Sequence, residues 1–198
     1  MYIKIGKRMA DTLFAVILLI LTSPILLITA LAIKLNSPGP IIFRQQRAGL
    51  NSQPFELYKF RSMKIETPEV ASNDLNGMDY NTSVGKFIRK LSIDELPQLF
   101  NVLKGDMSVI GPRPVILKET HLIGLRQQKH ADGVKPGITG LAQINGRDDM
   151  DDDTKADWDE NYVKNLTMNL DIKIFIKTII SVIKRDGIVE EKIKDEVR

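Results

Sequence analysis

The longest apolar stretch of the chain runs from Thr12 to Ile33, a range that contains no charged residue. At 1.5 Å per residue, a helix over this range is about 33 Å long, enough to cross a hydrocarbon core of about 30 Å. Ser23 and Pro24 interrupt the stretch near its middle. Because Pro24 has no N–H to donate to the Ile20 carbonyl, the pattern predicts a helix with a kink.

Both flanks of this stretch are basic, with Lys7 and Arg8 on one side and Lys34 on the other. A crossing helix usually carries its basic flank at one end only, so two basic flanks and a central proline are also compatible with a re-entrant helix that bends and returns to the same face. An ordinary span with a proline kink stays open, because membrane helices tolerate proline. The stretch is longer than the apolar region of a signal peptide, and no convincing cleavage site follows it.

Beyond residue 36, shorter apolar patterns predict a second domain over 37–198. Alternating or short apolar runs predict strands, and apolar residues at helical spacing predict helices. The expected fold class is α+β, mostly helical, with a small sheet and a long polar loop over 66–83. The expected strands are 41–43, 55–60 and 107–110, and the expected helices are 84–91, 92–103, 115–129, 153–165 and 170–184. The last helix is amphipathic, so it either packs on the core or lies in a lipid headgroup layer.

Composition excludes several function classes. The chain has 198 residues, no cysteine, two histidines and a formal net charge of +3. Disulfides, thiolate catalysis, Cys-ligated zinc and His-rich metal sites are therefore ruled out. A nucleic-acid binder concentrates far more Lys and Arg on one face, so no nucleic acid is expected as a partner. The modest positive charge fits contact with anionic lipid or phosphates.

The pair Asp94-Glu95 is the most suggestive acidic motif. Ser92-x-x-Glu95 matches a capping box, and Asp94 would stand in a first turn, where the helix dipole favours negative charge. A helix that begins at Asp94 places Pro97 at its third position, which is allowed. Such a helix start also offers free N–H groups that attract phosphate. The residues alone leave capping and catalysis both open, and capping is the simpler interpretation.

Cationic residues stand at element ends or in rigid turns: Lys59, Arg61, Arg89 and Arg113. Arg113 lies between two prolines, so its backbone is restricted. Arginine suits bidentate contacts with phosphate, although each of these residues alone also fits a solvated surface charge. Asp159 lies inside the helix predicted over 153–165, near Trp158 and Tyr162. Carboxylates are ligands that suit Mg²⁺ bridging a diphosphate.

The chain resembles the small monotopic polyprenyl-phosphate phosphoglycosyl transferases, the bacterial sugar transferase family that starts glycan assembly on undecaprenyl phosphate. The matching stretches follow one another along nearly the whole chain. They are KRMADTLFAVILLILTSPILL, GPIIFRQQRAG, FELYKFRSM, GKFIRKLSIDELPQLFNVLKGDMSVIGPRP, KPGITGLAQINGR and the DWDENYVKN region.

The resemblance implies a re-entrant helix over 1–36, broken at Ser23-Pro24, and a cytoplasmic catalytic domain over 37–198 at the bacterial inner membrane. Asp94 corresponds to the nucleophile that attacks the β-phosphate of a UDP-sugar and releases UMP. Undecaprenyl phosphate then takes the phosphosugar from Asp94, so the kinetics are ping-pong. Glu95 is the second member of this dyad.

The resemblance also implies a cofactor and further site residues. The expected cofactor is Mg²⁺, with Mn²⁺ as the alternative, held by Asp94, Glu95 and Asp159. The expected phosphate and substrate contacts come from Lys59, Arg61, Arg89, Arg113 and Arg147, together with Pro136, Gly137 and Thr139 of a turn-rich segment.

Several questions stay open at this point. The segments TPEVASNDL and GRDDMDDDTK are similar to members that transfer N-acetylated deoxy amino sugars in capsule or O-antigen synthesis. The expected partners are the UDP-sugar, undecaprenyl phosphate and membrane lipids, with a homodimer as an open alternative. Without the resemblance, the residues favour a non-enzymatic module that binds anionic lipid at the membrane surface or recruits assembly partners.

Overall fold

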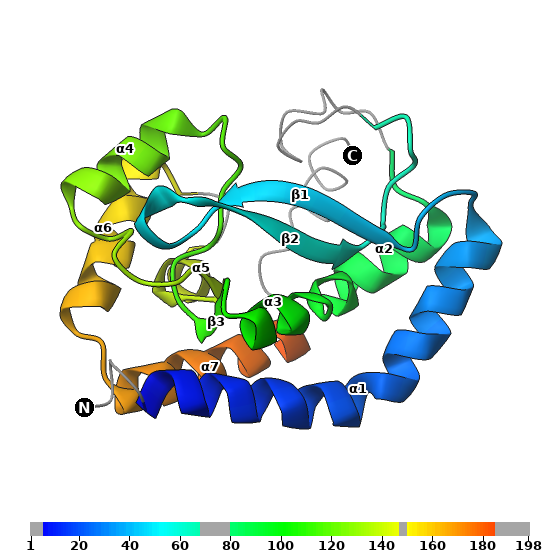
Figure 1. Cartoon of the computed structure of the whole chain (residues 1–198), viewed down its shortest axis with the longest axis horizontal. Helices are drawn as coiled ribbons and strands as arrows, with labels where there is room; N and C mark the ends of the chain where they lie inside the picture. The colour runs from blue at the N-terminus through cyan, green and yellow to red at the C-terminus, as the bar shows by residue number, and fades with distance from the viewer. Residues whose placement is uncertain (1–5, 68–79, 147–149, 185–198) are drawn as a thin grey trace.

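Helices surround two small sheets in the structure, a computed structural model that describes residues 6–67, 80–146 and 150–184 (Figure 1). The expected α+β, mostly helical class with little sheet is confirmed. The helices are α1 (Lys7–Asn36), α2 (Ser83–Lys90), α3 (Gln98–Lys104), α4 (Thr120–Gln128), α5 (Leu141–Asn145), α6 (Asp152–Lys164) and α7 (Met168–Lys184). The strands are β1 (Ile42–Ala48), β2 (Pro54–Phe60), β3 (Ser108–Ile110) and β4 (Gly137–Thr139), and two 3₁₀ turns are η2 (Leu50–Ser52) and η4 (Ile93–Glu95).

The first helix is bent. Figure 1 shows α1 running beside α7 and then turning to rise beside α2. Pro24 lies inside the helix, and the hydroxyls before it bond carbonyls of the preceding turn: Thr22 Oγ1 to Leu18 O at 2.7 Å and Ser23 Oγ to Ile20 O at 2.8 Å. These side chains satisfy backbone oxygens where the proline weakens the helical ladder. The predicted kink is present.

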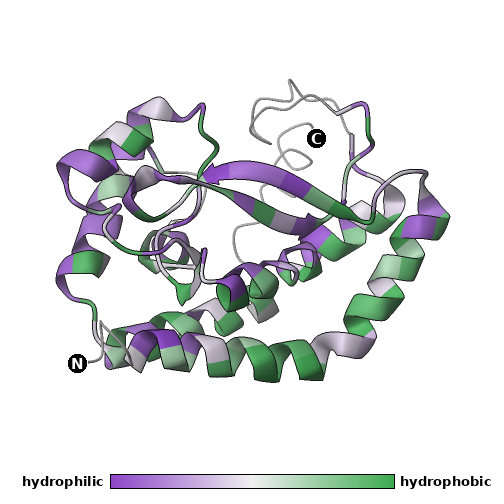
Figure 2. Ribbon diagram, viewed as in Figure 1, coloured by the Kyte–Doolittle hydropathy of each residue, from purple (hydrophilic) through white to green (hydrophobic). Residues whose placement is uncertain are grey.

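Most of the apolar surface of α1 is not covered by the protein. Among the described residues, α1 is the one helix long and apolar enough to cross a membrane, and only 11% of its most apolar window is buried. In Figure 2, hydrophobic residues colour much of the α1 ribbon green. A core helix of the same composition would instead be mostly buried, so the exposed face indicates an apolar environment around α1.

Buried polar contacts hold the beginning of α1 against the domain. Lys7 Nζ donates to Asp171 Oδ2 at 2.7 Å, and the Tyr162 hydroxyl donates to Asp171 Oδ1 at 2.9 Å. One turn further along α1, Asp11 accepts from Ser108 Oγ at 2.7 Å. We call these five residues the N-terminal anchor. The anchor joins α1 to α6, α7 and β3.

The end of α1 is held by the same domain. Arg61 follows β2 and is 5% exposed, and its guanidinium donates to Ser37 O and Ser37 Oγ, both at 2.8 Å, and to Pro38 O. Ile33 of α1 is buried with Phe60 and Ile88 in one apolar cluster. Both ends of α1 are therefore held by one domain.

Both sheets contribute side chains to the main apolar core, Leu57 from β2 and Val109 and Ile110 from β3. β1 and β2 form an antiparallel hairpin in which Ile42 opposes Phe60, and β3 and β4 pair in parallel. Asn101 of α3 is fully buried and connects α3 to the hairpin, donating to Glu56 O at 2.7 Å and accepting from Tyr58 N at 3.0 Å. The main cluster of buried apolar side chains comprises Ala15, Leu57, Leu99, Val102, Met107, Val109, Ile110, Tyr162, Leu166 and Ile174.

Two predicted helices begin later than expected. The helix predicted over 92–103 with its start at Asp94 is wrong: residues 93–95 form η4, and α3 starts at Gln98. Pro97 has no N–H to continue the hydrogen-bond ladder from η4, so it precedes the new helix. The helix predicted from Val115 begins at Thr120, because the Val115 carbonyl accepts from Ala48 N at 2.9 Å beside the end of β1. The loop predicted over 66–83 lies mostly outside the described residues.

We expect Lys7→Met to lower the stability of the fold by about 3–5 kcal/mol, because it removes the ammonium group that donates to the buried Asp171 carboxylate at 2.7 Å. Thermal unfolding of the detergent-purified protein measures the effect. Lys34→Met, at the exposed other end of the same helix, is the control and should cost less than about 1 kcal/mol. Equal losses for the two variants would contradict the proposed importance of the anchor.

Candidate active site

Asp94 and Glu95 stand in a turn and not in a helix cap. Ser92 adopts a left-handed backbone conformation with φ 54°, and its side chain makes no capping hydrogen bond. The capping-box interpretation is therefore wrong. The left-handed residue followed by η4 presents the two carboxylates next to β2 instead.

Two cations from other elements bind the Glu95 carboxylate. Lys59, near the end of β2, donates from Nζ to Glu95 Oε1 at 2.8 Å. The Arg113 guanidinium lies 3.5 Å from the same oxygen. Burial alone would raise the pKa of Glu95, but the charges and hydrogen bonds of Lys59 and Arg113 lower it to about 2. Glu95 is thus ionised at every physiological pH.

The pKa of Asp94, the residue before Glu95, is shifted in the opposite direction. Asp94 is 8% exposed, and burial raises its pKa to about 6, with the negative charge of Glu95 acting in the same direction. Lys59, Arg89 and Arg113 favour the ionised form and limit this rise. Asp94 is consequently a mostly ionised but unusually basic carboxylate at neutral pH, surrounded by three cations that can hold an anion beside it.

The backbone of β4 supports the loop that carries Arg113. Gly111 N donates to Thr139 O and Gly137 N donates to Pro112 O, both at 2.9 Å. A Cβ at Gly137 would lie 2.1 Å from Gly111 N, so a side chain there would force the strand and the loop apart. The predicted residues Gly137 and Thr139 therefore lie behind the loop and fix its path.

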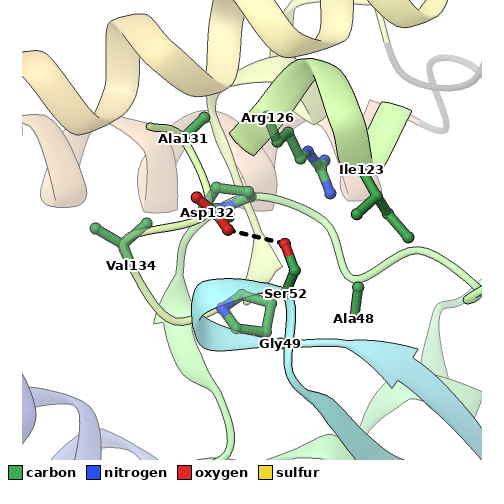
Figure 3. Close-up of a pocket in the computed structure, with 10 residues that line it drawn as sticks. Ala48, Gly49, Ser52, Ile123, Arg126, Ala131, Asp132 and Val134 are labelled. Carbon is green, nitrogen blue, oxygen red and sulfur yellow. Dashed lines mark hydrogen bonds between the residues drawn. The ribbon is translucent and has the colours of Figure 1, made fainter. Parts of the chain in front are cut away.

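Pro136 lines a small pocket on the far side of this loop. The pocket lies between the turn after β1 and the end of α4, and its volume of about 310 Å³ includes open solvent at its mouth. Figure 3 shows Arg126 of α4 reaching into it and Ser52 donating to Asp132, with an Oγ–Oδ2 distance of 2.8 Å. Pro112 also lines the pocket and links it to the Arg113 loop.

The structure does not bring two of the predicted residues to the carboxylate pair. Arg61 is engaged by the turn after α1, as described above, so its assignment to substrate phosphate is not supported. Asp159 is 1% exposed and accepts from Arg126, whose Nε lies 2.8 Å and whose terminal nitrogen lies 2.6 Å from Asp159 Oδ2. In the described part of the chain, no three His, Cys, Asp or Glu residues gather as a metal site, so the set Asp94, Glu95 and Asp159 is not formed. Arg147 lies outside the described residues.

Two functional candidates were missed by the sequence reasoning. Arg126 is a buried cation on a helix face that also buries Leu122, four residues earlier, and this placement of a charge was the available signal. Arg47 of β1 is half-buried, and burial together with the nearby charge of Arg113 lowers its pKa to about 10. Its guanidinium lies 3.4 Å from the Pro114 carbonyl oxygen. Nothing in the sequence distinguished Arg47 from the exposed Arg44 nearby.

This arrangement can support phosphoryl transfer. A buried carboxylate can act as a nucleophile toward phosphorus, and Lys59, Arg89 and Arg113 can stabilise the negative charge of the phosphoryl oxygens.

Comparison with known proteins identifies the family of the chain. Residues 2–185 match the bacterial sugar transferase family. The chain is 45% identical over 182 residues to the uncharacterized sugar transferase EpsL of Bacillus subtilis (strain 168), covering 92% of this chain and 89% of that protein. It is 41% identical over 203 residues to the undecaprenyl-phosphate galactose phosphotransferase of Salmonella typhimurium, covering 91% of this chain and 41% of that protein.

A longer relative matches a shorter region. The UDP-glucose:undecaprenyl-phosphate glucose-1-phosphate transferase of Escherichia coli (strain K12) is 47% identical over 148 residues, covering 72% of this chain and 32% of that protein. The chain belongs to the bacterial sugar transferase family. It is an enzyme of the phosphoglycosyl transferase class, which disfavours the non-enzymatic lipid-binding module.

We expect the side chain of Asp94 to titrate near pH 6 and its pKa to rise further in Lys59→Met, because that change removes a cation that favours the ionised carboxylate. Carbon-13 NMR of labelled aspartate carboxyls in detergent micelles measures both values. Lys129→Met, which removes a cation paired with Asp157, is the control and should leave the Asp94 titration unchanged. An Asp94 carboxyl that titrates at the ordinary value near 3.8 in both proteins would overturn this account of the site.

Proposed function

We propose that this enzyme transfers a sugar 1-phosphate from a UDP-sugar to undecaprenyl phosphate and releases UMP, by way of a phosphosugar ester on Asp94. The observation that carries the proposal is the buried, basic carboxylate of Asp94 among Lys59, Arg89 and Arg113. Three relatives named for glucose, galactose and N-acetylgalactosamine transfer to undecaprenyl phosphate support the donor and acceptor classes.

The reaction has two displacements at one phosphorus atom. In the first, an Asp94 oxygen bonds to the β-phosphorus, the bond to the bridging oxygen breaks, and UMP leaves with that oxygen and its electron pair. In the second, an oxygen of undecaprenyl phosphate bonds to the same phosphorus, the bond between phosphorus and the Asp94 oxygen breaks, and the Asp94 carboxylate departs with the electrons of that bond. Neither displacement needs a proton, so the ionised form of Asp94 is the active one.

The cations have separable roles in this scheme. Lys59 and Arg113 hold Glu95 at 2.8 and 3.5 Å, so Glu95 fixes them at the edge of the Asp94 site. Arg89, at the end of α2, adds positive charge beside Asp94. The three cations would bind the diphosphate before transfer and stabilise the charge of the leaving UMP.

The residues present fit a bound Mg²⁺. Mg²⁺ is commonly held by one or two carboxylates together with substrate phosphates, and Asp94 and Glu95 are two such carboxylates at the proposed phosphate site. When bound, the ion would neutralise charge on the diphosphate. Asp159 is left out of this ligand set because it is 1% exposed and is not gathered with Asp94 and Glu95 in the described structure.

We propose that α1 is re-entrant and enters one leaflet from the cytoplasmic side. A straight helix of 30 residues is about 45 Å long, and one that crossed the bilayer would place its ends on opposite sides. The N-terminal anchor and the Arg61–Ser37 contact instead hold both ends of α1 on one domain. The bend in α1 supports the same arrangement (Figure 1).

The last helix would lie at the lipid surface beside α1. The rings of Phe14 in α1 and Phe175 in α7 contact each other with centroids 4.8 Å apart, which places the two helices side by side. The exposed apolar residues of α7 are Met168, Ile172, Ile176, Ile179 and Ile180. Such a face suits the headgroup layer, where a lipid phosphate can reach Asp94.

Incubation with a UDP-sugar in the absence of lipid should add the mass of one phosphosugar to the protein, because the first displacement needs no acceptor. Asp94→Asn should give no adduct and should slow UMP release more than about 10³-fold, since the nucleophile is lost. Intact mass spectrometry and a UMP-release assay measure the two effects. The donor panel includes UDP-glucose, UDP-galactose, UDP-N-acetylgalactosamine and the N-acetylated deoxy amino sugars that we favour.

Asp157→Asn, at an exposed acid of α6, is the matched control and should retain adduct formation and UMP release. In the unmodified protein, UMP release should fall about tenfold per pH unit below pH 6 and level off above it, since protonation removes the nucleophile. UMP release that depends strictly on lipid, with no adduct for any donor, would rule out the covalent route.

A single cysteine introduced at residue 4 tests the re-entrant arrangement, because the natural chain has no cysteine. In intact cells, a membrane-impermeant maleimide should leave this cysteine unlabelled until the membrane is permeabilised. A cysteine at position 34, at the other end of α1, should behave in the same way. Labelling of one site but not the other from outside would show that α1 crosses the bilayer.

A further inference from the structure

The pair formed by Asp159 and Arg126 has no part in the reaction proposed above. The two residues join α6 to α4 inside the protein, where they are 1% and 7% exposed. Arg126 Nε and a terminal nitrogen lie 2.8 and 2.6 Å from the same carboxylate oxygen of Asp159. Burying both charges costs desolvation energy, so apolar side chains of similar volume would join the two helices at least as stably.

The remaining terminal nitrogen of Arg126 binds the loop that carries Arg113. It donates to the carbonyl oxygen of Arg113 at 2.9 Å. This carbonyl belongs to the peptide bond with Pro114, in a loop that β4 holds from its other side through Gly111 and Pro112. The planar guanidinium of Arg126 thus spans from the Asp159 carboxylate to the backbone of Arg113.

The backbone of Arg113 determines where its side chain can reach. The Arg113 side chain is 41% exposed, and its guanidinium lies 3.5 Å from Glu95. Long arginine side chains lose considerable rotamer freedom when they are held in one place, so a fixed backbone lowers the cost of holding this one.

We propose that Asp159 and Arg126 are positioning residues for the phosphate-binding residue Arg113. Asp159 orients Arg126, and Arg126 fixes the Arg113 carbonyl so that the Arg113 guanidinium faces the Asp94–Glu95 pair. The inference rests on the function proposed above. It also gives Asp159 a role other than metal ligation.

Two variants test the two contacts of Arg126, one with the Asp159 carboxylate and one with the Arg113 carbonyl. Asp159→Asn removes the charge that orients Arg126. Arg126→Lys keeps a cation for Asp159, but one ammonium group does not span both the carboxylate and the Arg113 carbonyl. Asp157→Asn is the matched control, because Asp157 and Lys129 form an exposed ion pair at 2.6 Å between α6 and the end of α4.

Hydrogen–deuterium exchange of the full chain in micelles gives a measurement that does not depend on activity. Peptides covering residues 107–119 should exchange faster in Asp159→Asn and Arg126→Lys than in the wild type or in Asp157→Asn. Unchanged exchange in both test variants, relative to the control, overturns the proposal. If the wild type releases no UMP from any donor, the proposed function fails while this exchange experiment still decides the positioning role.

Kinetics provide the second measurement. The KM for the UDP-sugar should rise about 10- to 100-fold in Arg126→Lys, the range expected for a lost charged hydrogen bond, while the Mg²⁺ concentration for half-maximal rate stays unchanged in Asp159→Asn. In an Arg113→Ala background, Arg126→Lys should cause no further loss, because it acts through Arg113. Independent, multiplying losses, or a higher Mg²⁺ requirement in Asp159→Asn, would contradict the proposal.

Discussion

The attachment of both ends of α1 to one domain is the constraint on which the rest of the structure depends. The beginning of the helix is held by the buried contact of Lys7 with Asp171, and its end by the contacts of Arg61 with the turn after it. Between these points the apolar residues of α1 are largely exposed. A helix held in this way cannot move its ends apart, so its bend and its exposed face together determine where the domain sits relative to an apolar phase.

A second constraint is the contrast between two neighbouring carboxylates. Glu95 lies in contact with Lys59 and Arg113, and its pKa is lowered to about 2. Asp94 is more deeply buried, and its pKa is raised to about 6. One turn of chain thus supplies a permanent anion that fixes two cations and a more basic carboxylate that can react. The left-handed conformation of Ser92 makes this division possible, because it directs the acids into a turn beside β2.

The sequence predicted local elements better than it predicted partners. Alternation and helical spacing located β2 and the helices α2, α6 and α7, because these patterns reflect burial directly. The strand predicted over 41–43 covers only the beginning of β1, whose polar second half has no such pattern. Lys59 and Arg113 do contact Glu95, and the charge of Arg89 acts on Asp94, while the predicted binding of phosphate by these three residues stays a prediction. The conformation of Ser92 was not predictable, since serine adopts it rarely and the capping pattern was complete.

The partners of buried charges were less predictable still. Asp159 is bound by Arg126, a residue of another helix that lies 33 positions away in the chain. Arg61 donates to Ser37 in the turn after α1. Such pairings depend on how helices pack, and residue type alone does not encode them.

The contact of Lys7 with Asp171 also has a consequence for the order of folding. The two residues are 164 positions apart, so nearly the whole chain must be synthesised before the pair can form. The apolar first helix leaves the ribosome long before its last partner does, at a few to about twenty residues per second. In the proposed arrangement, α1 would enter the bilayer during that interval, before the domain that later holds both of its ends has formed. The domain would then be completed at the membrane, where the proposed lipid acceptor lies.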